Sequence, residues 1–187
     1  MTEPIAIAGA YELSPGRYPG DDVALYRTVL KGALQRWSIH PRDVDGLITH
    51  PSGGISGYNP YIHTGLISEL GLSPTFVETI NLGGATYLSM VDHAALAIRA
   101  GRANTVLCVS AGKFMKPSEG GGTLMAGAIS DLDLEVPYGT WIPALYGLIA
   151  SQFMAERHVT PEDMARVAVS ARMWARLNPS ARMHKSA

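Results

Sequence analysis

The chain has 187 residues, of which 47% are hydrophobic and 17% charged, and its formal net charge is −1. This length and composition are typical of a globular domain rather than a disordered one. A near-neutral charge without a Lys/Arg-rich run argues against nucleic acid as a binding partner. A single cysteine excludes an internal disulfide, and without an apolar leader or a run of about 18 apolar residues we expect a cytoplasmic protein without a membrane span.

In the first third of the chain, an apolar run typical of a strand precedes a stretch whose apolar residues recur at helical spacing. Residues 4–10 form a short apolar run that predicts a buried strand. Asp21 and Asp22 predict the start of a helix, because a carboxylate there caps free backbone N–H groups. The expected core face of this helix consists of apolar residues at helical spacing: Val23, Tyr26, Leu30 and Leu34.

The next elements continue the alternation up to residue 112. Strands are expected at 45–49, 75–80 and 104–112, and a helix near 62–70 that Gly71 ends. A second helix is expected from Ala85 to Ala100 with Gly101 behind it. Its predicted core face consists of Leu88, Val91, Ala95 and Ile98. Strands apolar on both faces that alternate with helices predict an α/β fold, with a parallel-rich sheet covered by helices on both faces.

The pattern changes after Lys113. A long glycine-rich stretch follows, and then two helices are expected at about 143–156 and 160–177, the second announced by "TPED". We therefore divide the chain into an incomplete α/β domain, residues 1–112, and a loop region with two helices, residues 113–187. Because no closing strand follows, we expect this polypeptide to be part of a larger assembly.

The stretch "ETINLGGATYLSM", residues 78–90, predicts a strand, a tight glycine turn and a helix start. Such turns present a nucleophile or bind an anion, yet the apex Gly83–Gly84 carries no reactive side chain. The backbone N–H groups of the turn are candidate donors to an oxyanion, with Asn81 and Thr86 as flanking candidates. The alternatives are a turn that needs only glycine flexibility, and a Thr86 that only begins the helix.

Other reactive side chains have plainer interpretations. Cys108 is expected to be a buried core thiol, and His93 to be a surface or structural histidine more than a catalytic base. His50 and His63 lack a third ligand at telling spacing, so no metal site is predicted. The glycines at 120–122 lack the lysine of a phosphate-binding loop. The tryptophans are expected in the core or at an interface: Trp37, Trp141 and Trp174.

Two blocks of the sequence carry a family resemblance. The order of strand, "NLGGAT" turn, helix "LSMVDHAALAIRAGRA" and strand "NTVLCVSAG" resembles the N-terminal half of the thiolase superfamily. The later stretch, "VPYGTWIPALYGLIASQFMAERHVTPEDMARVAVSARMWARLNPSA", is similar to thiolase-like lipid-transfer proteins of the sterol carrier protein type. That group includes the aldolases of bacterial steroid side-chain degradation, and the resemblance covers essentially the whole chain.

The resemblance implies where the chemistry lies and what is absent. In the family this turn carries a nucleophilic cysteine at the helix N-terminus, where a thiolate is stabilised, and counting back from Gly101 places that position at Gly84. A covalent acyl-enzyme therefore cannot form on this turn. The family's other catalytic groups belong to motifs of the C-terminal half that do not occur here. Tyr138 and Tyr146 correspond to the loop region over the active site, where Tyr138 is expected to line the pocket more than to act as acid or base.

Three functions follow as hypotheses. The first is part of a cysteine-less thiolase-like enzyme that cleaves a carbon–carbon bond of an acyl-CoA by retro-aldol chemistry, with the CoA thioester as substrate and no other cofactor. The second is a non-catalytic acyl-CoA or lipid-binding or scaffold subunit, and the third an inactive fragment. The expected partners are a second copy in a homodimer, a protein that supplies the C-terminal half, or an OB-fold accessory subunit.

Overall fold

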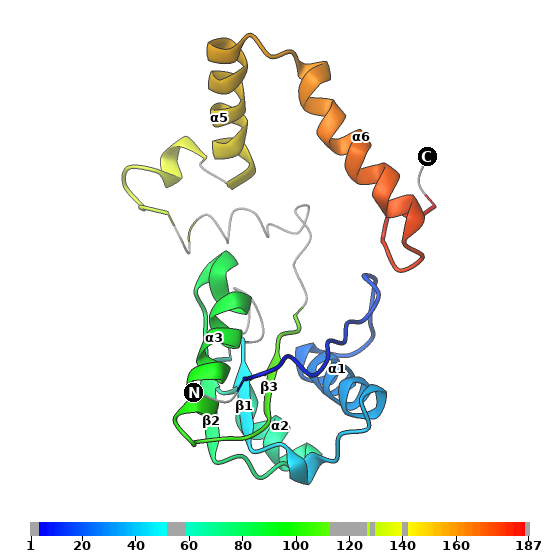
Figure 1. Cartoon of the computed structure of the whole chain (residues 1–187). Helices are drawn as coiled ribbons and strands as arrows, with labels where there is room; N and C mark the ends of the chain where they lie inside the picture. The colour runs from blue at the N-terminus through cyan, green and yellow to red at the C-terminus, as the bar shows by residue number, and fades with distance from the viewer. Residues whose placement is uncertain (1–3, 52–58, 113–126, 128–129, 140–141, 186–187) are drawn as a thin grey trace. The chain divides into compact units, whose positions relative to one another are not determined.

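The computed structural model describes residues 4–51, 59–112, 127, 130–139 and 142–185 (Figure 1). The chain separates into two compact units. The first contains Met1–Leu13 and Tyr18–Phe114, and the second contains Ser14–Arg17 and Met115–Ala187. The interpretation of these parts as a thiolase-like domain and a loop domain stays a prediction. The glycines at 120–122 and Trp141 lie outside the described residues.

A three-stranded parallel sheet forms the centre of the first unit (Figure 1). Its strands are β1 (Gly46–Thr49), β2 (Phe76–Thr79) and β3 (Val106–Val109), in the order β2-β1-β3. In this register Ile48 lies opposite Glu78 on one side and Cys108 on the other. The predicted α/β fold with a parallel sheet is confirmed.

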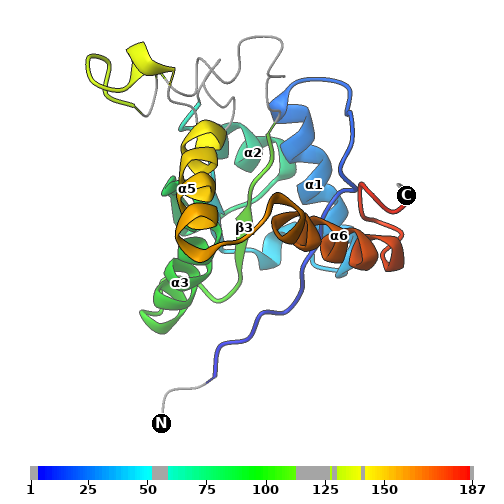
Figure 2. The ribbon, with the colours of Figure 1, turned by 90° about the horizontal axis from the view of Figure 1, so that it is seen from above.

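Helices cover both faces of this sheet (Figure 2). They are α1 (Asp22–Arg36), α2 (Ile62–Leu70) and α3 (Thr86–Arg99). Successive residues of a strand point to opposite faces, and the two central residues of β1 belong to different cores. Leu47 packs in a cluster with α1 and α2, whereas Ile48 packs in a cluster with α3. The central strand is therefore buried on both faces, as its unbroken apolar run predicted.

Local signals set the helix boundaries. Asp21 caps α1, because its carboxylate accepts a hydrogen bond of 2.8 Å from the Ala24 N–H. Gly71 and Gly101 follow α2 and α3 with left-handed φ values of 63° and 68°, which a glycine adopts without strain. These starts and stops are confirmed within a residue or two.

The predicted strand at residues 4–10 is wrong. This segment has no regular secondary structure, and Ile7 is 78% exposed. At the end of this segment, the Ala10 carbonyl accepts a 3.1 Å hydrogen bond from the indole N–H of Trp37. Since a strand needs a neighbour for its backbone groups, an apolar run alone does not decide that it will pair.

The predicted core face of α3 is also wrong. The buried residues are Thr86, Met90, Ala94 and Ala97, whereas Leu88 is 80% exposed and Val91 43% exposed. Successive residues lie about 100° apart around a helix, so α3 carries two adjacent apolar stripes. The stripe with two alanines packs on the sheet in this chain, because small side chains allow close approach. We call the other stripe, Tyr87, Leu88, Val91 and Ala95, the outer face of α3.

Cys108 is exposed rather than buried in the core, which corrects a further prediction. β3 is an edge strand of the described sheet, so one of its sides has no neighbouring strand. The Sγ atom nevertheless donates a weak 3.5 Å hydrogen bond to the Met90 carbonyl of α3, and burial around the sulfur raises the pKa of the thiol to about 11. A thiol with a raised pKa is a poor nucleophile, as expected for this position.

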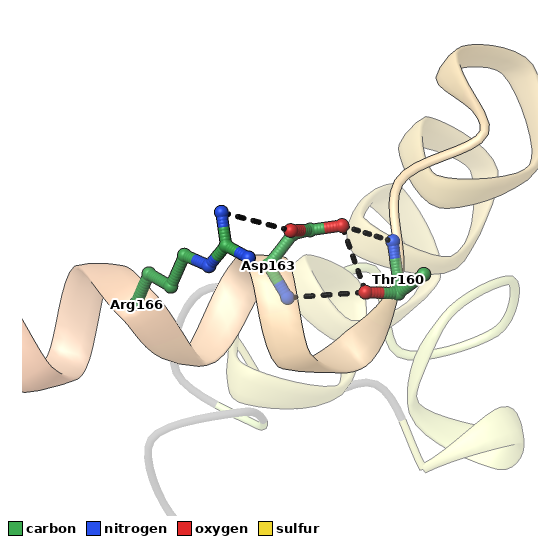
Figure 3. A network of polar contacts seen from close by, with 3 residues as sticks. All are labelled: Thr160, Asp163 and Arg166. Atoms are coloured by element: carbon green, nitrogen blue, oxygen red, sulfur yellow. Dashed lines mark hydrogen bonds and ion pairs between the residues drawn. The ribbon is translucent and has the colours of Figure 1, made fainter.

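The second unit contains the short turn η4 (Val136–Tyr138) and two helices, α5 (Ile142–Arg157) and α6 (Pro161–Leu177). The helix start that "TPED" predicted is confirmed, and Thr160 and Asp163 form a capping box there. The Asp163 N–H donates to Thr160 Oγ1, and Asp163 Oδ2 accepts from the Thr160 N–H (Figure 3). Neither helix has a buried residue, and Trp174 is 72% exposed. Trp174 is thus not a core residue, and its place at an interface stays a prediction.

Among the described residues, none of the helices is both long enough and apolar enough to cross a membrane.

Candidate functional site

The carboxyl ends of β1 and β2 form the candidate site. β1 leads into α2 on one face of the sheet, whereas its neighbour β2 leads into α3 on the other face. In parallel α/β sheets, ligands bind at the carboxyl ends of two neighbouring strands whose connections leave toward opposite faces. We call this end of β1 and β2 the crevice, by analogy with that class of fold. The predicted glycine turn follows β2 directly, so it lies at this crevice.

The turn itself is closed by its own hydrogen bonds. Gly83 has φ +57°, which favours glycine, and Asn81 Oδ1 accepts a 3.3 Å hydrogen bond from the Gly83 N–H. Thr86 is fully buried; its hydroxyl accepts from the Leu82 N–H at 2.8 Å and donates to the Gly83 carbonyl at 2.7 Å. The Thr86 side chain therefore stabilises the turn in this chain, and its contact with a substrate stays a prediction, as does that of Asn81.

Only part of the predicted backbone cradle remains available to a ligand. The Ala85 N–H donates to the Leu82 carbonyl, and the Thr86 N–H donates to the Gly83 carbonyl. Of the N–H groups at positions 82–86 in the described turn, the Gly84 N–H is left for a ligand. A Cβ atom at Gly84 would meet nothing within 4 Å, so space does not require glycine at this position. The geometry thus accommodates a side chain where the resemblance places the family's nucleophile.

A chain of three polar side chains lies beside the turn, and the sequence did not point to it. Thr49 ends β1 and is fully buried, and its Oγ1 lies 2.9 Å from Oγ1 of Thr79, which ends β2. Oγ1 of Thr79 also lies 2.9 Å from Nδ1 of the half-buried His63, in the first turn of α2. The signal available in the sequence was a threonine at the end of two neighbouring strands.

His50 and Tyr26 lie at the same edge of the sheet. The Tyr26 hydroxyl donates a short hydrogen bond to the His50 carbonyl, and burial raises the pKa of this phenol to about 12. The His50 ring lies 6.5 Å from the ring of Tyr87, in the first turn of α3. Tyr26 therefore holds the end of β1 in place as a neutral donor.

His93 and Tyr138, the two side chains weighed as catalytic candidates, lie elsewhere in their units. Nδ1 of His93 lies 2.9 Å from Oε2 of Glu78, and both side chains are about half exposed. His93 is seven residues beyond Thr86, about 10 Å along the helix axis at about 1.5 Å per residue. Tyr138 ends η4 in the second unit and is 83% exposed. A catalytic role for either residue, and a pocket contact for Tyr138, stay predictions.

The described residues contain no group of three or more His, Cys, Asp or Glu side chains that could hold a metal ion. The polar atoms at the crevice are hydroxyl, imidazole and amide groups, which suit hydrogen bonding to a carbonyl or carboxylate oxygen.

Taken together, the fold and the crevice define a parallel α/β protein with a hydrogen-bonding site at the carboxyl ends of two strands. No family model matches the chain. The chain is 32% identical, over 186 aligned residues, to a protein of Thermomonospora curvata named "Steroid side-chain-cleaving aldolase". The match covers 95% of this chain and 46% of that relative, so the chain spans about half the length of the relative.

Proposed function

We propose that the chain is part of a cysteine-less thiolase-like enzyme that cleaves a carbon–carbon bond of an acyl-CoA thioester by retro-aldol chemistry, in lipid or steroid side-chain degradation. The observation that carries this proposal is the 32% identity, along almost all of the chain, to a protein named as a steroid side-chain-cleaving aldolase. The parallel α/β fold and the glycine turn at the crevice support it.

The proposed reaction needs no nucleophile at Gly84. A base removes the proton of the β-hydroxyl group, the bond between the α and β carbons breaks, and its electron pair forms the enolate of the thioester. The β carbon leaves as a ketone or aldehyde, and a proton returned to the α carbon completes the shorter acyl-CoA. Hydrogen-bond donors must stabilise the enolate oxygen, and the Gly84 N–H is one such donor in this chain.

We propose further that a second polypeptide covers the outer face of α3 and supplies what the remaining half of the relative contains. A helix with apolar residues around most of its circumference is stable only when buried on more than one side. Leu88 and Val91 are exposed in this chain. A second protein that supplies the C-terminal half is one of the partners that the resemblance implies. A homodimer and an OB-fold accessory subunit are the other partners that the resemblance implies.

A second candidate is a non-catalytic subunit that binds acyl-CoA or lipid. It is favoured by one observation: the described turn offers a single available N–H and no acid–base side chain at its apex. The same site then binds a thioester oxygen without changing it.

Purification of the protein with its native partner, followed by an assay with a β-hydroxyacyl-CoA, separates the two candidates. Release of a ketone or aldehyde together with a shorter acyl-CoA supports the aldolase. Tight binding of the CoA ester without turnover rules the aldolase out and leaves the binding subunit.

The variant Gly84→Cys tests the assignment of the turn. Because a Cβ at this position meets nothing within 4 Å, a cysteine fits, and we expect it to be acylated by a CoA thioester. The matched control is Asp92→Cys on the exposed side of α3, which should not be labelled. Equal labelling of both variants would show that the turn confers no special reactivity.

A further inference from the structure

The side chains at the ends of β1 and β2 determine which ring nitrogen of His63 carries the proton. Two hydrogen bonds link Thr49 Oγ1 to Thr79 Oγ1 and Thr79 Oγ1 to His63 Nδ1, each 2.9 Å long. Each hydroxyl donates one hydrogen and accepts up to two. With a neutral imidazole, the chain of bonds therefore runs in either of two directions, or Thr49 and His63 both donate to Thr79.

The pairing of the hydroxyl hydrogens decides between these arrangements. If His63 Nδ1 carried the proton, it would donate to Thr79, Thr79 would donate to Thr49, and the Thr49 hydroxyl would need another acceptor. The described residues offer it none, and an unpaired hydrogen on a fully buried hydroxyl is unfavourable. If Thr49 and His63 both donated to Thr79, the Thr79 hydrogen would likewise have no acceptor among the described residues. In the direction from Thr49 to His63, Thr49 donates to Thr79 and Thr79 donates to Nδ1, so both hydroxyl hydrogens are paired.

This direction makes Nδ1 an acceptor and leaves the proton of His63 on Nε2. The second nitrogen accepts no hydrogen bond in this state; it presents an N–H. His63 is half-buried, in the first turn of α2 and beside the crevice where the connections of β1 and β2 part. A neutral imidazole held in this way is a donor suited to a carbonyl oxygen, because it polarises the carbonyl without adding a full charge.

We infer that His63 is a substrate-binding residue whose Nε2–H donates a hydrogen bond to the carbonyl oxygen of an acyl thioester, with Thr79 and Thr49 as positioning residues that hold its tautomer. This inference rests on the proposed acyl-CoA substrate. It adds a second donor, from the α2 side of the crevice, to the Gly84 N–H on the α3 side. Two donors are what an enolate or thioester oxygen needs, and the turn by itself offers one.

The tautomer is measured first, in the whole chain with any partner that co-purifies. Long-range ¹H–¹⁵N correlation spectra of ¹⁵N-histidine-labelled protein distinguish the two nitrogens, and the spectrum of His63→Gln assigns the signal. We expect the proton on Nε2. In Thr49→Val the buried hydroxyl is absent, so the preference should weaken and a mixture of tautomers should appear. A proton on Nδ1 in the unaltered protein overturns the inference.

Ligand contact is measured with two probes that differ in one group. Acetyl-CoA carries the thioester carbonyl, and S-ethyl-CoA is a thioether without it. We expect the protein to bind acetyl-CoA more tightly, and His63→Leu to lose about tenfold in acetyl-CoA affinity without change for S-ethyl-CoA, as for one lost hydrogen bond. His63→Gln retains an N–H donor and should recover part of the loss, which a merely structural role of His63 would not produce.

The outcomes separate this inference from the proposed function. If the protein binds both probes and His63→Leu keeps the preference for acetyl-CoA, the role of His63 is wrong and the acyl-CoA substrate stands. If the unaltered protein binds neither probe, the acyl-CoA substrate is wrong, and the role of His63 is overturned with it. Equal weakening for both probes in His63→Leu shows a structural role and also overturns the inference.

Discussion

The helices α1 and α3 flank the same sheet, but the buried face predicted from the sequence is correct for α1 and wrong for α3. In α1 three of the four predicted core residues, Tyr26, Leu30 and Leu34, are buried. The fourth, Val23, is half-buried and packs against the same cluster. In α3 none of the four predicted core residues is buried: two are exposed and two are half-buried. A neighbouring set with two alanines packs on the sheet instead. We infer that the helical spacing of apolar residues identifies the buried face only when a helix has a single apolar stripe. A helix with two stripes needs a second surface to cover the other.

The largest expected effect comes from a substitution on the buried face of α1. Leu30 is almost fully buried in the cluster with α1 and α2, so Leu30→Ala should destabilise the chain by about 2–5 kcal/mol. The matched variant Leu88→Ala, on the outer face of α3, should change the free energy of unfolding by less than about 0.5 kcal/mol. Urea denaturation of both variants without a partner measures the contrast; similar losses would mean that the outer face is already covered.

The second prediction tests that outer face in the presence of the proposed partner. Leu88→Asp should leave the stability of the chain by itself nearly unchanged, because Leu88 is exposed. It should weaken association by about tenfold or more, since an unpaired carboxylate is costly at an apolar contact. Co-purification and titration with the partner measure this. Unimpaired association would place the contact on another surface, and the control Arg99→Asp tests whether any acidic residue on α3 has the same effect.

Asp45 contributes to stability through hydrogen bonds rather than through apolar burial, because its carboxylate links the start of β1 to the start of β3. Its carboxylate accepts bonds of 2.7–2.9 Å from the Asn104 N–H, the Asn104 side chain and the Thr105 N–H. Partial burial opposes the charged form, but these donors outweigh it and hold the pKa of Asp45 below its ordinary value. Asp45→Ala should destabilise the chain by about 1–3 kcal/mol.

The same carboxylate gives a pH dependence with a definite sign. The pKa is lower in the folded chain than in the unfolded chain, so the charged form stabilises folding at pH values above the unfolded pKa of about 4. This contribution is lost as the pH falls below about 4 and through the folded pKa. Asp45→Asn should therefore flatten the decrease in unfolding free energy measured by denaturant titration from pH 6 to pH 3. An unchanged slope would exclude Asp45 as its source.

The smallest effect concerns α6, which has no buried residue and begins by local signals alone. Thr160→Ala removes one half of the capping box and should destabilise the start of this helix by about 1 kcal/mol, seen as faster amide exchange in its first turn. The hydroxyl of Thr160 also holds the pKa of Asp163 below its ordinary value. The control Arg166→Ala removes an exposed 3.4 Å ion pair with Asp163 and should have little effect (Figure 3). Equal exchange in both variants would mean that the cap is not what starts α6.

The glycine turn was predicted from a few adjacent residues, and the polar chain beside it was not. Gly83 and Thr86 are close in the sequence, so the pattern of strand, glycine and helix start already placed them together. In the sequence, Thr79 is 16 residues from His63 and 30 residues from Thr49. Only the parallel pairing that sets Thr49 beside Thr79 brings the two threonine hydroxyls to 2.9 Å from each other.

By itself the sequence determined where helices begin and end, since caps such as Asp21, Gly71 and Thr160 act through hydrogen bonds and backbone angles of neighbouring residues. It also determined the parallel α/β class, through apolar strands that alternate with helices. Only the tertiary structure decided that residues 4–10 do not pair, that Cys108 lies on an edge, and which stripe of α3 is buried. Those outcomes depend on which surfaces are available to cover an apolar group, and this is a property of the whole packed chain and not of any local segment.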